Sequence, residues 1–141
     1  SPGRLEALRR NPTVLVDAAH NPHGARALAK AMEDSFEFSA LVGVVGMLTD
    51  KDAHGFLAAL ELTLHQVVIT RPSSARAMDP DILAAIAVDV FGEDRVFVEP
   101  DLPDAIDRAV SLAETSDAYG GVGVLITGSV VLVGDAKKLL S

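Results

Sequence analysis

The sequence contains no cysteine, few aromatic residues and no long apolar run. Without cysteine, neither a disulfide framework nor a thiolate metal site can form. Aromatic residues make up only 4% of a chain that is 49% hydrophobic, so the core must consist mainly of Val, Leu, Ile and Ala. No apolar run approaches the roughly 18 residues that a membrane-spanning helix requires, and no basic leader precedes an apolar segment. These absences favour a cytoplasmic protein that does not enter a membrane.

Positive charge is sparse as well. The formal net charge is −8, and no cluster of Lys and Arg is longer than two residues. Binding of nucleic acid over a broad face needs concentrated cations, and this composition disfavours it. A nucleotide ligand needs only one or two local cations, so the charge does not exclude one.

Five short runs rich in β-branched residues predict strands. Each run is almost continuously apolar, which is typical of parallel strands buried on both faces. Between the runs lie segments whose apolar residues recur at helical spacing. The alternation predicts an α/β fold, namely a three-layer αβα sandwich around a mainly parallel, Rossmann-like sheet. The predicted strands are 13–16, 40–46, 66–70, 95–98 and 121–127, and the predicted helices are 22–35, 51–62, 79–92 and 102–115.

The last segment, residues 129–140, fits two structures. Its valines favour a strand, whereas its Leu and Ala residues fit one face of a helix. We expect a helix, because the segment begins with a turn at Thr127-Gly128 and an N-cap at Ser129. A single domain over residues 1–141 is expected from the length and from the lack of internal repeats.

Polar residues are concentrated where the predicted strands end. Asp17 and His20 follow the first strand, Lys51 and Asp52 follow the second, and Ser129 follows the fifth. In open parallel sheets, ligands bind beyond the carboxyl ends of the strands. These residues therefore predict a binding crevice at one edge of the sheet.

Each of these residues also has a purely structural interpretation. Asp17 could cap a loop by accepting backbone N–H bonds, and His20 could be a packed loop histidine. Asn21 with Pro22 is fully explained as a helix start, and Lys51 between two acids fits a solvated helix start. The residues alone leave these alternatives open.

Several standard motifs are missing. The chain has no GxGxxG, no GxxxxGK[ST] phosphate-binding loop and no His/Asp/Glu cluster with metal-ligand spacing. It therefore cannot hold a triphosphate in the manner of a P-loop, and we predict no metal site within it.

Four segments taken in order nevertheless form a recognisable set: PGRLE (2–6), VLVDAAHNP (14–22), GMLTDKD (46–52) and ITGSVVLVG (126–134). Together they resemble the C-terminal domain of folylpolyglutamate synthase and of its bifunctional form with dihydrofolate synthase activity, in the Mur ligase superfamily. The resemblance extends essentially from end to end. The closing TGSxxLVG favours the folate branch over the peptidoglycan ligases.

The resemblance implies an ATP-dependent carboxylate–amine ligase of folate biosynthesis and one-carbon metabolism. In that family the ATP γ-phosphate passes to a substrate carboxylate, and the amine of L-glutamate attacks the resulting acyl phosphate. The acceptor would be folate or dihydropteroate. ATP and Mg²⁺ would be held mainly by an N-terminal P-loop domain that this fragment lacks, so the isolated domain is expected to be inactive.

The resemblance also implies roles for single residues. His20 would be the catalytic residue, facing the incoming glutamate or the acyl phosphate. Arg4 would contact the ATP phosphates, and Asp17 would hold the nucleotide through its ribose or through Arg4. The residues expected to bind substrate are Ser129, as a second contact for glutamate, and Lys51 and Asp52, as contacts for the amino acid or for phosphate.

Three other functions are compatible with parts of the sequence. A peptidoglycan-precursor ligase would perform the same chemistry on a nucleotide-sugar acceptor. A phospho-acceptor receiver module has a similar alternation, but Thr70 and Thr127 stand where it requires an Asp and a Lys. A free-standing binding domain on this scaffold is the third.

Overall fold

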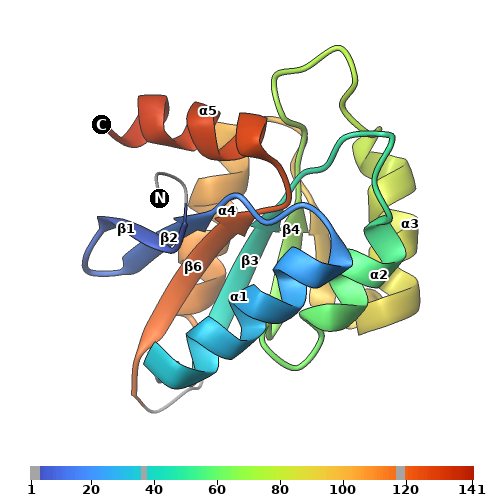
Figure 1. Ribbon diagram of the computed structural model, residues 1–141. Helices are drawn as coiled ribbons and strands as arrows, with labels where there is room; N and C mark the ends of the chain where they lie inside the picture. The colour runs from blue at the N-terminus through green and yellow to red at the C-terminus, as the bar shows by residue number, and fades with distance from the viewer. Residues whose placement is uncertain (1–3, 36–37, 117–119) are drawn as a thin grey trace.

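The chain forms an α/β domain in the computed structural model, which describes residues 4–35, 38–116 and 120–141 (Figure 1). The strands are β1 (Glu6–Arg9), β2 (Thr13–Asp17), β3 (Ala40–Val45), β4 (Gln66–Ile69), β5 (Val96–Val98) and β6 (Val122–Thr127). The helices are α1 (Pro22–Ser35), α2 (Ala53–Ala59), α3 (Pro80–Phe91), α4 (Leu102–Glu114) and α5 (Val130–Leu140), with a 3₁₀ turn at Glu93–Arg95.

The strands make one sheet in the order β1-β2-β6-β3-β4-β5, parallel throughout except for the antiparallel pair of β1 and β2. Helices α1, α2 and α3 cover one face, and α4 and α5 cover the other, each over its own cluster of buried residues. The predicted three-layer sandwich with a mainly parallel sheet is confirmed.

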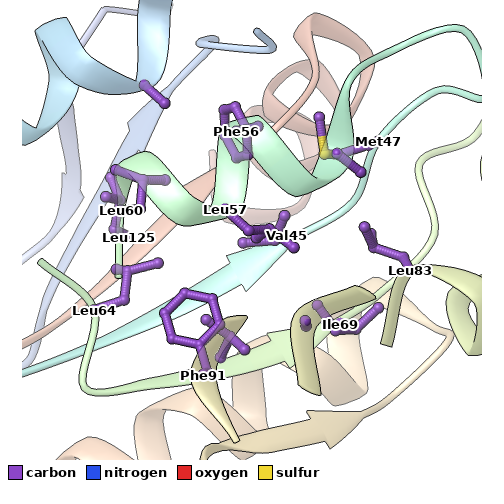
Figure 2. Packing of buried hydrophobic residues seen from close by; sticks show 14 of the residues in the cluster. Val45, Met47, Phe56, Leu57, Leu60, Leu64, Ile69, Leu83, Phe91 and Leu125 are labelled. Carbon is purple, nitrogen blue, oxygen red and sulfur yellow. The ribbon is translucent and has the colours of Figure 1, made fainter. Parts of the chain in front are cut away.

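The core under α2 and α3 illustrates how the aliphatic composition is used (Figure 2). Phe56 and Leu57 of α2 and Leu83 of α3 pack over Val45 and Ile69 of the sheet, and all five are fully buried. Four of these five side chains are aliphatic, and burial of each large side chain contributes about 1.5–3 kcal/mol.

Most predicted elements are present, and helix boundaries coincide with the predicted caps. Asp79 accepts a hydrogen bond from the N–H of Asp81 at 2.9 Å and Gly92 ends α3, while Ser129 caps α5. The ambiguous last segment is helical, as expected. The boundaries predicted for the helix over 51–62 were wrong at both ends, because Asp52 is the N-cap of α2 and the helix ends at Ala59.

Strand β1 was not predicted from the sequence. Its four residues, Glu-Ala-Leu-Arg, are not β-branched and alternate between half-buried and exposed positions at the edge of the sheet. Pairing with β2, and not local preference, makes this segment a strand. Pro2 and Gly3 of the PGR triplet lie outside the described residues.

Two loops at the carboxyl edge of the sheet are joined by their backbones. Leu48, after β3, and Ala77, after β4, form an isolated antiparallel bridge. Beside it, the N–H of Thr49 donates to the carbonyl of Arg76 at 2.9 Å. The loops run next to each other above the sheet in Figure 1, so residues distant in sequence meet beside the site described below.

Gly128 allows the turn between β6 and α5 to enter this edge. Its φ is +113°, and a Cβ on it would lie 2.5 Å from the carbonyl oxygen of Gly46. Its N–H donates to the carbonyl of Ala19 at 3.0 Å. Only glycine fits this conformation and this close approach without displacing the backbone.

We therefore expect Gly128→Ala to lower the free energy of unfolding by more than about 2 kcal/mol, through left-handed strain and a backbone clash. Gly134→Ala is the matched control, because an added Cβ in the middle of α5 meets no described atom within 4 Å. That change should raise stability by up to about 1 kcal/mol. Urea unfolding of the two variants measures both effects, and equal effects would contradict the argument.

Candidate active site

The carboxyl ends of three adjacent strands are aligned. In the register of the sheet, Asp17 at the end of β2 is paired with Thr127 of β6, and Thr127 is paired with Val45 of β3. The turns that follow these strands therefore meet. They carry His20, Lys51 and Ser129, and two adjoining hollows at this edge share His20.

His20 is half-buried in the turn between β2 and α1. Its Nδ1 lies 3.0 Å from the carbonyl oxygen of Ala18. A carbonyl only accepts, so this contact requires a proton on Nδ1, and in the neutral ring the lone pair is then on Nε2. Asn21, next in the chain, caps α1 by accepting from the N–H of Gly24 at 2.7 Å, which confirms its structural interpretation.

The larger hollow, of about 650 Å³, lies between the N-terminal segment and the start of α1. Arg4, Asp17 and His20 are among its lining residues, and Arg4 is exposed. The structure thus brings together the two residues expected to bind nucleotide and the expected catalytic residue.

Asp17 is engaged by the backbone within this hollow. Its Oδ2 accepts from the N–H of Leu5 at 3.0 Å, and its Oδ1 accepts from the N–H of Ala19 at 2.9 Å. The loop-capping interpretation of Asp17 is therefore confirmed. The carboxylate also fixes the distance between the N-terminal segment and the His20 turn.

The smaller hollow, of about 120 Å³, brings His20, Lys51 and Ser129 together. The Oγ of Ser129 accepts from the N–H groups of Val131 and Leu132 at 3.0 and 3.2 Å. Because the oxygen is used as an acceptor, the hydroxyl hydrogen is the part of this side chain that can be offered to a ligand. With Lys51 and the positive end of α5, the hollow suits a carboxylate.

Asp52 is the one expected site residue that lines neither hollow. Its Oδ1 accepts from the N–H of Gly55 at 2.9 Å and thereby caps α2. A Cβ on Gly55 would lie 2.8 Å from the ring of Pro22, so the starts of α1 and α2 are packed closely. Asp52 therefore has a structural role at the start of α2, directly after Lys51.

Arg76 and Asp50 were not predicted as site residues. Arg76 Nη2 lies 2.9 Å from Asp50 Oδ2, across the two joined loops. The residues are 26 positions apart, and no local pattern could have connected them.

A third hollow, of about 720 Å³, lies at the amino edge of the sheet beneath α1, with Met32, Phe38 and Leu41 in its lining. It is the most voluminous of the three, yet we place the site at the carboxyl edge. Ligands of open parallel sheets bind at that edge, and the turns with His20, Lys51 and Ser129 converge there.

The described residues contain neither a membrane-spanning helix nor a cluster of metal ligands. Residues 4–35, 38–116 and 120–141 include no helix long and apolar enough to cross a bilayer. Within the same part of the chain, no three His, Cys, Asp or Glu side chains are grouped as metal ligands.

Comparison with known proteins identifies relatives of the whole chain. The family model for the Mur ligase glutamate ligase domain matches residues 3–130. The dihydrofolate synthase/folylpolyglutamate synthase of Mycobacterium tuberculosis is 49% identical over 99% of this chain and 30% of its own length. The structure of the M. tuberculosis folylpolyglutamate synthase with ADP and AMPPCP superimposes with a TM-score of 0.95 and 50% identity, over 100% of this chain and 32% of that one.

A more distant solved structure has the same fold. Escherichia coli FolC, in complex with DHPP and ADP, superimposes with a TM-score of 0.82 and 26% identity, over 99% of this chain and 31% of that one. The chain thus spans about 30% of the length of the curated relative it matches.

The Asp17 geometry predicts a loss of stability in Asp17→Ala. Two N–H groups lose their acceptor, and the free energy of unfolding should fall by about 1–3 kcal/mol. Asp17→Asn keeps one acceptor oxygen and should cost less. Asp34→Ala, which removes an exposed α1 carboxylate paired with Lys30 at 3.5 Å, should change stability by less than about 0.5 kcal/mol. Urea unfolding compares the three variants. If Asp17→Ala were as stable as Asp34→Ala, the two hydrogen bonds to the Asp17 carboxylate would not contribute to stability.

Proposed function

The chain belongs to the Mur ligase family, as a glutamate ligase domain, and from this premise we propose that it is the C-terminal domain of an ATP-dependent ligase that adds L-glutamate to folate. The proposal rests on one observation: two adjoining hollows share His20. The chain that forms them is 49% identical to a dihydrofolate synthase/folylpolyglutamate synthase. Dihydropteroate is the second acceptor that the name of this relative suggests. We place the reaction in the cytoplasm.

The larger hollow is the proposed contact with the nucleotide. When bound, ATP with Mg²⁺ supplies the phosphoryl group that activates the acceptor carboxylate. Arg4 is exposed at this hollow, and its guanidinium can hold two phosphate oxygens at once. Asp17 supports this contact by fixing the backbone next to Arg4. The absence of a P-loop motif fits a domain that closes over a nucleotide held mainly by an N-terminal partner domain in the same protein.

The smaller hollow is the proposed site for L-glutamate. Lys51 and the Ser129 hydroxyl offer a cation and a donor for a carboxylate of this substrate. His20 can accept a proton at Nε2, because Nδ1–H is engaged by the carbonyl of Ala18. A base in this position would take a proton from the glutamate ammonium. The neutral amine then attacks the carboxyl carbon of the acyl phosphate, and inorganic phosphate leaves as the amide bond forms. Asp52 acts in this proposal only as the cap of α2, directly after Lys51.

Family membership excludes one of the alternative functions and leaves another open. A receiver-like signalling module is inconsistent with a Mur ligase domain. A peptidoglycan-precursor ligase would use the same hollows with another acceptor, so acceptor specificity separates it from a folate ligase.

The first test is His20→Ala in the full-length protein. Loss of the proton acceptor should lower kcat for glutamate addition by roughly 10²- to 10⁴-fold. The fold should survive, because His20 is only half-buried in a turn. The assay is ATP-dependent incorporation of labelled glutamate into dihydropteroate, folate or a nucleotide-sugar acceptor.

His54→Ala is the matched control, because His54 is exposed on α2 and lines none of the three hollows. It should retain full activity. Incorporation into the nucleotide-sugar acceptor alone would favour the peptidoglycan alternative, and undiminished activity of His20→Ala would remove His20 from the mechanism.

The isolated chain, residues 1–141, should neither hydrolyse ATP nor bind it tightly. It has no P-loop, and the part of it that the structure describes has no grouped metal ligands. Isothermal titration with ATP and Mg²⁺ measures the binding, and phosphate release measures turnover. Tight binding by the chain alone would support a free-standing binding domain instead.

A further inference from the structure

Asp50 lies between two cations, one of which, Lys51, lines the smaller hollow. Arg76 Nη2 is 2.9 Å from Asp50 Oδ2, whereas Lys51 Nζ is 3.9 Å from the same oxygen. The first distance is that of a charge-assisted hydrogen bond, and the second is too long for one. Arg76 therefore holds the carboxylate, and the ammonium of Lys51 keeps its donors for another acceptor.

The two cations differ in where they lie. The Lys51 side chain is 29% exposed and lines the hollow with His20 and Ser129. The Arg76 side chain is 63% exposed and is not part of that lining. A ligand in the hollow would thus meet Lys51 directly and would be affected by Arg76 only through Asp50.

We propose that Arg76 is a positioning residue that neutralises Asp50 and so keeps Lys51 available for a carboxylate of the incoming amino acid. The inference rests on the proposed function, in which this hollow receives L-glutamate. Without Arg76, the Asp50 carboxylate would attract Lys51 into a close pair and would also repel an anionic substrate. Both effects weaken binding of a carboxylate and leave the reacting atoms untouched.

The backbone position of Arg76 does not depend on its ion pair with Asp50. Its carbonyl accepts from the N–H of Thr49, and the adjacent Leu48–Ala77 bridge joins the same two loops. Both bonds are made by the backbone, so they persist when either charged side chain is replaced. Variants at Asp50 and Arg76 are therefore expected to fold, and melting temperature serves as the check.

The test uses four forms of the full-length protein: wild type, Arg76→Gln, Asp50→Asn and the double variant. Arg76→Gln should raise KM for glutamate roughly three- to tenfold with little change in kcat, as expected for a partly exposed charge. Asp50→Asn should leave KM unchanged or lower it, because Lys51 then has no competing carboxylate. The double variant should match Asp50→Asn, which is rescue of the first defect by the second substitution.

A purely structural role of the ion pair predicts a different pattern. Either single substitution breaks the pair, so both would raise KM, and the double variant would not be rescued. That pattern, or an unchanged KM in Arg76→Gln, would overturn the inference. Arg26→Gln is the charge-matched control at the hollow on the amino edge, and it should have no effect on KM. Higher ionic strength should also shrink the Arg76→Gln defect.

Failure of the proposed function is recognised separately. If the wild-type protein incorporates no glutamate with any acceptor, the assignment of the reaction fails before the variants are compared. If the wild type is active and Arg76→Gln is indistinguishable from it, only the role of Arg76 fails.

Discussion

The position of His20 depends on one short series of hydrogen bonds that starts at the Asp17 carboxylate. Asp17 holds the N–H groups of Leu5 and Ala19, and the carbonyl of Ala19 accepts from Gly128 at 3.0 Å. Segments from both ends of the chain are thus tied to the turn that precedes His20. A half-buried carboxylate with two backbone donors costs little to keep, since both oxygens are satisfied, and its loss would leave two donors unpaired.

Small residues make this convergence possible. Gly128 approaches the Gly46 carbonyl so closely that a Cβ would meet it at 2.5 Å, and Gly55 leaves similarly little room beside Pro22. Three turns can therefore come together without bulky side chains between them. Lys51 lines the smaller hollow, and Arg76 offsets the charge of the neighbouring Asp50, on a chain whose formal net charge is −8. The overall charge therefore says little about the ligand that the site can hold.

The sequence predicted those features that local rules determine. Buried parallel strands are apolar along their whole length, and caps such as Ser129 and Asp79 reveal helix starts within a few residues. Because parallel strands align their carboxyl ends, most of the site could be located as well. Strand β1 and the Asp50–Arg76 pair could not be predicted, since both are created by contacts between distant segments. Asp52 lies after the predicted strand, as expected, but its carboxylate caps α2 and does not line either hollow.

The proposed ligase reaction would activate one substrate and then bring the second to the same carbon, and two hollows that share one histidine fit this requirement. The tautomer of His20 determines which of its ring nitrogens can accept a proton. Because the carbonyl of Ala18 engages Nδ1–H, a neutral His20 has one proton-accepting nitrogen, and the backbone determines which one it is. The tautomer is thus selected before any ligand enters. This preorganisation relies on the same turn that Asp17 and Gly128 hold, so the stability of this edge and the chemistry proposed for it have a common structural origin.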